Sequence, residues 1–97
     1  MVAQRLTISD ARFHLIARAL ADPRRYDLLR RIGKAGDTLA CESLRTTCCE
    51  ITAATLSHHM KELETAGLVE STREGKFVNY RLRRDVLEAY LARMAQI

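Results

Sequence analysis

The sequence predicts a small, mostly α-helical domain with a β-hairpin near its end. Apolar residues recur three and four positions apart through most of the 97-residue chain, which indicates amphipathic helices. Over residues 70–82 this spacing changes to alternation around a glycine turn, which indicates two short strands. The length suits one domain and is too short for two. We therefore expect a single domain over residues 1–97, ordered helix, helix, helix, helix, hairpin, helix.

Two helices are expected in the first part of the chain, after a loose arm over residues 1–8. Ser9 is expected to cap the first helix, whose apolar face contains Phe13, Ile16, Ala17 and Leu20. Asp22-Pro23 ends this helix and begins the second, because Asp caps a helix and Pro fits its first position. The apolar side of the second helix is expected to contain Tyr26, Leu28, Leu29 and Ile32, and its end is marked by Gly33 and Gly36.

The third and fourth helices are predicted to form a pair joined by a short turn. A short helix is expected around Cys41–Arg45, followed by a turn through Thr46–Glu50. Thr52 then caps the fourth helix, and Gly67 ends it because glycine readily adopts a left-handed conformation. The apolar stripe of the fourth helix consists of Leu56, Met60 and Leu63.

A hairpin and a final helix complete the predicted order. Leu68-Val69 leads into the hairpin, and Glu74-Gly75-Lys76 supplies its turn. Asp85 is expected to cap the last helix, over residues 84–97. The apolar positions of that helix are Leu87, Tyr90, Leu91, Met94 and Ile97.

The distribution of charge favours a polyanionic partner. The chain carries 16 basic and 12 acidic residues. Between residues 73 and 84 a single acid, Glu74, stands among five basic residues: Arg73, Lys76, Arg81, Arg83 and Arg84. Charge alone is equally compatible with a solvated hairpin edge. No apolar run approaches the ~18 residues of a membrane span and no secretory signal pattern opens the chain, so we expect a cytoplasmic protein with no membrane partner.

Two helices joined by a short turn and followed by a basic two-stranded hairpin make a winged helix-turn-helix. In that fold the fourth helix would enter the major groove of DNA with its N-terminal residues. The candidate DNA-contacting residues are Ala53, Ala54, Thr55, Ser57, His58 and Lys61 on the helix, with Arg73 and Lys76 on the hairpin. Ser57 and His58 can donate to base edges or phosphates, whereas Lys61, one turn later, suits a phosphate.

The adjacent histidines favour DNA contact over metal binding. Neighbouring residues on a helix point about 100° apart, and a chelating pair needs a spacing of three or four. His59 lies beside Met60 on the inner side of the helix and is interpreted as a half-buried, hydrogen-bonded histidine. His58 is interpreted as facing the DNA.

Three segments give the chain a family resemblance: "ALADPRRYDLLRRI" (19–32), "TLSHHMKELETAGLVE" (55–70) and "REGKFVNYRL" (73–82). With these segments in this order and spacing, the chain resembles the ArsR/SmtB family of bacterial winged-helix repressors. The resemblance implies a dimeric, cytoplasmic repressor that binds a palindromic operator in double-stranded DNA. It also implies release from DNA when a metal, a metalloid or another small signal binds, or when thiols are oxidised. The implied dimer interface, on the first and last helices, contains Phe13, Ile16, Leu20, Leu87, Tyr90, Leu91 and Met94.

The cysteines leave the nature of the signal open. Members of the family often sense metal through a Cys-x-Cys pair in the third helix or through ligands in the last helix. Here "LACESL" holds the single Cys41 and "RDVLEAYLARMAQI" has neither histidine nor cysteine, so zinc sensing through the last helix is not expected. Cys41, Cys48 and Cys49 form a soft ligand set suited to a metalloid such as arsenic(III).

Geometry limits this hypothesis, because seven residues of continuous helix would separate Cys41 from Cys48 by ~10.5 Å. Two interpretations remain. The thiols sense a metalloid or an oxidant, or they are small apolar core residues in a regulator without a metal response.

Two other classes of protein fit the sequence less well. A cysteine enzyme with His58 or His59 as its base would need an orienting group and an oxyanion site, and the sequence offers no glycine-rich turn for one. We therefore do not expect an enzyme. A winged-helix module that binds protein is the remaining alternative, but it would not need Ser57, His58 and Lys61 beside a basic hairpin.

Overall fold

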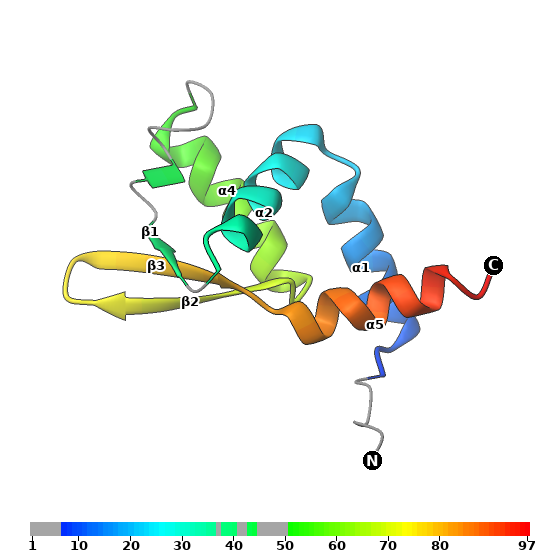
Figure 1. The fold of residues 1–97 in the computed structure, drawn as a ribbon. Coiled ribbons are helices and arrows are strands. Elements are labelled where there is room, and N and C mark those ends of the chain that lie inside the picture. Colours follow the sequence, from blue (N-terminus) through cyan, green and yellow to red (C-terminus); the bar gives the residue numbers. More distant parts are fainter. Residues whose placement is uncertain (1–6, 37, 41–42, 45–50) are drawn as a thin grey trace, which may run out of the picture.

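The computed structural model describes residues 7–36, 38–40, 43–44 and 51–97 (Figure 1). The elements are α1 (Asp10–Leu20), α2 (Pro23–Lys34), β1 (Leu39–Ala40), α4 (Ala53–Thr65), β2 (Val69–Glu74), β3 (Phe77–Leu82) and α5 (Arg84–Met94). The β2–β3 hairpin extends to one side of the helices, and α5 lies beside α1 on the other side (Figure 1). The expected mostly helical fold with a hairpin is thus confirmed.

The predicted N-caps of the first, second and fourth helices are present. The Ser9 side chain accepts a hydrogen bond of 3.1 Å from the backbone N–H of Arg12. The Asp22 carboxylate accepts from the N–H groups of Arg24 and Arg25 at 2.8 and 3.3 Å. At the start of α4 the Thr52 hydroxyl accepts from the N–H of Thr55 at 3.1 Å. These bonds satisfy N–H groups that would otherwise lack partners, so the sequence fixes where each helix begins.

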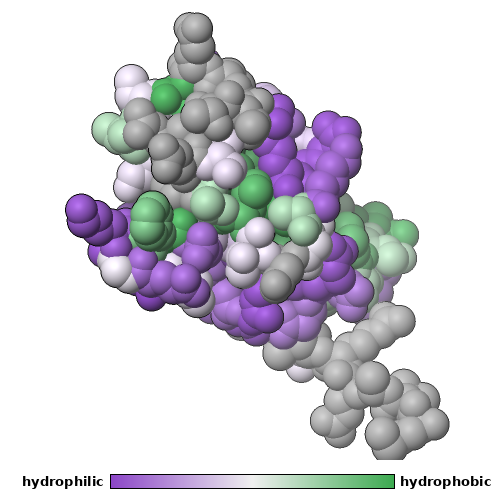
Figure 2. Space-filling model, turned by 60° about the vertical axis from the view of Figure 1, so that its left-hand side comes forward, coloured by the Kyte–Doolittle hydropathy of each residue, from purple (hydrophilic) through white to green (hydrophobic). Residues whose placement is uncertain are grey.

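The core lies between the helices and the inner face of the sheet. Its largest fully buried side chains are Ile16, Leu28, Ile32, Leu44, Leu56, Met60, Leu63 and Leu68. On the face drawn in Figure 2, hydrophilic residues predominate and hydrophobic residues form a band across the middle. Because Leu56, Met60 and Leu63 are among the buried core residues, the predicted stripe of α4 is confirmed as part of the core.

The sheet contains a strand that the sequence did not predict. Its three strands are antiparallel in the order β1-β3-β2, with Leu39 opposite Tyr80 and Glu74 opposite Phe77. Gly75, with a φ of 64°, opens the two-residue loop between β2 and β3, as its place in the predicted turn requires. β1 has only two residues, too few to show alternation, and it becomes a strand by pairing with β3.

Several local predictions are corrected by the structure. Tyr26 is 56% exposed and does not join the apolar side of α2. The last helix begins at Arg84 and ends at Met94, before the predicted end at residue 97, so Ile97 is outside it and 98% exposed. No side chain caps its start. Asp85 was expected to be the cap, but its carboxylate pairs with the Arg83 guanidinium at 2.9 Å. Gly33 lies inside α2, and Gly36, with a φ of 84°, follows its end.

Parts of other predictions fall on undescribed residues. Ser43 and Leu44 are helical, as expected for a helix around Cys41–Arg45, but the rest of that segment and the turn after it lie outside the described residues. So do residues 1–6 of the expected arm. Within the described part of the chain, no helix is long and apolar enough to cross a membrane.

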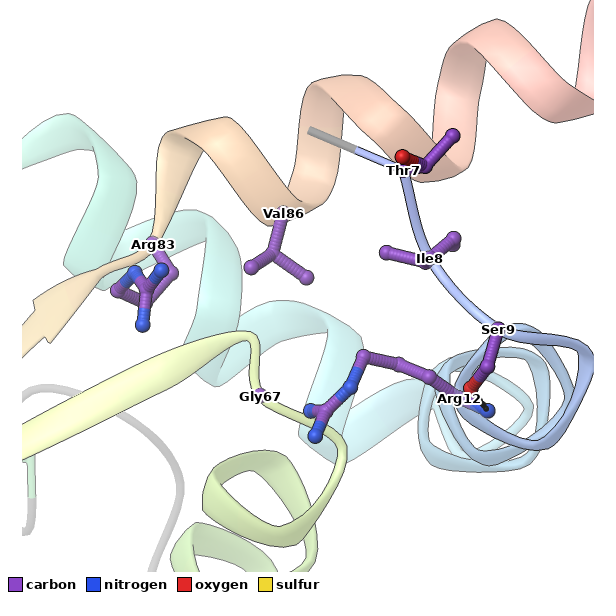
Figure 3. A pocket seen from close by; sticks show the side chains of 7 residues that line it. All are labelled: Thr7, Ile8, Ser9, Arg12, Gly67, Arg83 and Val86. Atoms are coloured by element: carbon purple, nitrogen blue, oxygen red, sulfur yellow. Dashed lines mark hydrogen bonds between the residues drawn. The ribbon is translucent and has the colours of Figure 1, made fainter. Parts of the chain in front are cut away.

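The end of α4 is held by a glycine and covered by an arginine from α1. Gly67 has a φ of 83°, and the N–H of Leu68 donates back to the carbonyl of Leu63 at 3.0 Å. A Cβ added at Gly67 would clash with a terminal nitrogen of Arg12. Figure 3 shows the Arg12 guanidinium directed at Gly67, at the edge of a polar cavity of about 260 Å³. The positive side chain thus lies at the negative end of the α4 dipole.

Replacing Gly67 by alanine should destabilise the chain for two separable reasons. The left-handed backbone costs a residue with a Cβ about 1–2 kcal/mol, and the new methyl group displaces Arg12. Gly36→Ala is the matched control, because its φ is also positive but nothing lies within 4 Å of an added Cβ. Urea denaturation at one protein concentration should show a larger loss for Gly67→Ala. The excess should vanish in an Arg12→Ala background, and an unchanged excess would show that Arg12 is not its cause.

Candidate nucleic-acid interface

The outer face of α4 carries most of the predicted DNA-contacting residues. Leu56, His59, Met60 and Leu63 are buried, which turns the remaining positions toward solvent. The exposed positions include Ala53, Ala54, Ser57, His58 and Lys61. Thr55 is half-buried, and its hydroxyl accepts a 2.9 Å hydrogen bond from the Thr52 hydroxyl. Thr55 therefore supports the start of the helix and is less free to contact a ligand.

A groove brings α4 and the hairpin together. Its volume is about 490 Å³, and Ser57 and Lys61 of α4 face it together with Arg73 of β2. The predicted DNA-contacting residues of α4 and of the hairpin thus line the same groove. The groove also contains Ser71 and Glu64, which sequence reasoning missed. Ser71 could have been found from strand alternation, because it lies two residues before Arg73 and therefore on the same face of the sheet.

The five basic residues of the hairpin region are not equivalent. Arg81 pairs with Glu70 across the hairpin, and Arg83 pairs with Asp85. Arg73, Lys76 and Arg84 form no ion pair with any residue that the structure describes, and all three are exposed. Arg73 and Lys76 lie at the Gly75 turn together with exposed Glu74, so two unpaired cations and one acid give the tip of the hairpin a net positive charge.

His59 lies on the inner side of α4, as predicted, and it is buried rather than half-buried. Its side chain is 6% exposed, and its Nδ1 lies 3.4 Å from Nη1 of Arg25. The same Arg25 donates to the carbonyl oxygen of Ala19 at 2.8 Å. Burial lowers the pKa of His59, the Asp22 carboxylate offsets part of this effect, and the Arg25 guanidinium lowers the pKa further. The contact between His59 and Arg25 therefore joins α4 to α2, and Arg25 in turn joins both to the end of α1.

The histidine pair is not arranged as a metal site. The ring centroids of His58 and His59 are 5.9 Å apart, and the two side chains face solvent and core respectively. No group of three His, Cys, Asp or Glu side chains among the described residues is placed to hold a metal ion. Cys41, Cys48 and Cys49 lie outside the described residues, so the predicted thiol site stays a prediction.

A second exposed surface runs along α1 and α5. Phe13 stacks on Tyr90 with ring centroids 5.1 Å apart, and the Arg93 guanidinium lies 4.4 Å from the Phe13 ring centroid. Beside this cluster Leu91 is 54% exposed and Met94 41%. Leu20 and Leu87 are half-buried at its edge.

Ile16 is a correction to the predicted interface. Its side chain is 0% exposed because it packs in the core of its own chain, so it has no surface to offer a partner. Leu15, which was not among the predicted interface residues, is 36% exposed on α1.

Comparison with known proteins identifies the architecture. A family model described as "Helix-turn-helix domain" matches residues 20–72. The chain is 32% identical over 76 residues to the uncharacterised HTH-type transcriptional regulator YceK of Bacillus subtilis, a match that covers 78% of this chain and 75% of YceK. It is 31% identical over 72 residues to the arsenic resistance transcriptional regulator ArsR1 of Pseudomonas putida, covering 74% of this chain and 55% of ArsR1.

Solved structures of similar fold include transcriptional regulators of the same architecture. A crystal structure of an ArsR family transcriptional regulator superposes with a TM-score of 0.81 at 20% identity, covering 94% of this chain and 91% of that one. The homodimeric winged helix-turn-helix domain of Mb0332 from Mycobacterium bovis, a possible ArsR-family regulator, superposes with a TM-score of 0.71 at 27% identity. That match covers 98% of this chain and 88% of the other.

Stability should fall with acid because of His59. Its lowered pKa means that the unfolded chain binds a proton before the folded chain does as the pH falls below the ordinary value of 6.5. The contribution of His59 to the free energy of unfolding is therefore complete above that pH. It is lost below that pH, with a slope of at most about 1.4 kcal/mol per pH unit. Denaturation of His59→Gln between pH 7 and pH 5 should show a shallower decline. His58→Gln, on the exposed neighbour, should keep the wild-type decline, and equal profiles for all three proteins would contradict the assignment.

Proposed function

The chain belongs to the ArsR family of winged helix-turn-helix transcriptional regulators, and we propose that it acts as a homodimeric, cytoplasmic repressor of transcription. In this proposal each protomer places α4 in the major groove of double-stranded DNA and its β2–β3 hairpin against the neighbouring backbone. The observation that carries the proposal is the convergence of Ser57, Lys61 and Arg73 on one groove.

Each part of this surface has a distinct task. The small side chains of Ala53 and Ala54 let the start of α4 approach the base pairs, where Ser57 and His58 donate to base edges. Lys61 contacts a phosphate one turn later. Arg73 and Lys76 bind the backbone without reading sequence, because both are exposed cations without an ion-pair partner among the described residues and lie at the hairpin tip. Glu64, further along the groove, repels phosphate and so limits DNA contact to the N-terminal half of α4.

The α1–α5 surface is proposed to join two protomers. Leu91 and Met94 are large apolar side chains exposed beside the Phe13–Tyr90 stack, and covering them removes apolar area from water. A two-fold dimer would present two α4 helices about 34 Å apart, one turn of DNA, to a palindromic operator.

The release signal is proposed to act on the thiols of Cys41, Cys48 and Cys49. They precede the Thr52 cap in the sequence, so a metalloid bound by them or a disulfide between them would act next to the start of α4.

The helix and the hairpin should respond differently to substitution. Ser57→Ala and His58→Ala should lose about 1–3 kcal/mol on the operator and little on random DNA, because they remove base contacts. Arg73→Gln and Lys76→Gln should weaken binding to both DNAs and lower the salt slope by about one unit each. Fluorescence anisotropy over a salt series measures both quantities. Arg18→Gln removes one charge from exposed α1 and should bind as wild type. Equal losses on both DNAs for the helix variants would refute the division of roles.

The full chain should be a dimer at micromolar concentration. Leu91→Glu should yield monomers in light scattering, because a carboxylate would be buried at the centre of the apolar surface. Phe77→Glu is the matched control: Phe77 is 64% exposed at the hairpin tip, and its replacement should leave the dimer intact. A monomeric wild-type chain would overturn the proposed interface.

The cysteines can be tested by release from DNA. Cys48→Ser and Cys49→Ser should bind the operator normally and should no longer leave it when arsenite or peroxide is added. Gel shifts with and without each reagent measure the effect. If wild type stays bound under both reagents, or the variants are still released, the thiols are structural and their loss should cost only about 1–2 kcal/mol of stability.

A further inference from the structure

An aromatic side chain is left exposed at the tip of the β2–β3 hairpin. Phe77 is the first residue of β3 and is 64% exposed. The other exposed large apolar side chains of the described residues lie on α1, on α2, on α5 or after α5. Phe77 is thus the one such side chain that the described part of the hairpin presents to solvent.

Neither the core nor the proposed dimer covers Phe77. Side chains alternate between the two faces of a strand, and Val78 and Tyr80 line the groove beside α4. Phe77 therefore points to the opposite face of the sheet. The hairpin extends away from α1 and α5, which carry the proposed dimer surface, so a partner subunit joined there would lie on the far side of the protomer (Figure 1).

The surroundings of Phe77 continue the proposed DNA-binding surface. Arg73 lines the groove beside α4 and also reaches the hairpin tip, where Lys76 precedes Phe77. Glu74 lies directly opposite Phe77 across the hairpin. Two exposed cations and one exposed acid leave a net charge of +1 at the tip (2 − 1). Such a charge attracts phosphates but reads no sequence, so any selectivity at the tip has to come from another group.

We propose that Phe77 enters the minor groove beside the α4 site and inserts between two base pairs, so that it selects DNA steps that open easily. This inference rests on the proposed function, because α4 has to place the hairpin on the duplex. Apolar side chains inserted from the minor groove open a base step and bend the duplex. Pyrimidine–purine steps open most readily, whereas A-tracts are stiff. Phe77 thus reads deformability where no base edge is hydrogen-bonded.

Selection from a library of random-sequence duplexes tests the proposal without a known operator. Wild type and Phe77→Ala should both enrich the same half-site, because α4 is unchanged. Only wild type should also enrich TA or CA/TG steps at a fixed distance from that half-site. Enrichment of these steps by both proteins, or by neither, would overturn the inference and leave the proposed function standing. Pools without any shared half-site would overturn the proposed function itself, and the inference with it.

A duplex from the wild-type pool then serves as the probe of affinity and shape. Phe77→Ala should bind it at least about fivefold more weakly than wild type, and at most about twofold more weakly when an AA step replaces the flexible one. A fluorescent adenine analogue at the step should brighten with wild type, because the base loses its stacked neighbour, and stay dim with Phe77→Ala. Energy transfer between the duplex ends should show a smaller bend with the variant. Equal bends and equal fluorescence for the two proteins would contradict insertion.

Two further variants at the tip separate insertion from charge. Phe77→Leu keeps an apolar side chain and should retain most of the bend and the step preference. Glu74→Gln removes the acid and should tighten binding to flexible and stiff duplexes alike. Both positions are exposed, so these variants and Phe77→Ala should keep the wild-type fold and dimer. Loss of the step preference in Glu74→Gln would assign that preference to charge and overturn insertion by Phe77.

Discussion

The burial of one stripe of α4 is the constraint on which the surface of this protein depends. Leu56, Met60 and Leu63 are each at most 1% exposed, and burial of such side chains contributes about 1.5–3 kcal/mol apiece. A rotation of the helix that exposed this stripe would cost most of that free energy. The outward direction of Ser57, His58 and Lys61 therefore follows from core packing and needs no contribution from DNA.

Two arginines connect this anchored helix to α1 at different points. Arg25 stands beside His59 and donates to the Ala19 carbonyl, near the end of α1. Arg12, near the start of α1, covers Gly67 just after α4 ends. α1 also supplies Phe13 to the contact with Tyr90. The proposed dimer surface and α4 are therefore both connected to α1. In the proposed dimer, the relation of one α4 to its partner's would thus be set largely by how two copies of α1 and α5 meet.

The sequence predicted the features that depend on local chemistry. Thr52, Asp22 and Gly67 act through side chains or backbone freedom within a few residues, and each lies where it was expected. Features that depend on distant partners were missed. Asp85 looked like a cap, but the N–H of Arg83 donates to the carbonyl of Leu68 at 2.8 Å, which extends the β2–β3 pairing up to the residue before α5 and places Asp85 inside the helix. The pairing of Arg81 with Glu70, which divides the basic residues into paired and unpaired ones, likewise needed the strand register.

These magnitudes restrict how a signal can release the protein from DNA. A ligand that binds one state 100-fold more tightly supplies about 2.7 kcal/mol. That is less than the free energy that holds three buried side chains of α4, so such a signal cannot turn the helix within its own chain. It does exceed the roughly 1 kcal/mol of a single threonine cap such as Thr52. It is also comparable with the cost of exposing one large apolar side chain, such as Leu91 in the proposed dimer interface. Release is therefore expected to act either on the turn before α4 or on the contact between protomers, and in both cases the core of each protomer stays intact.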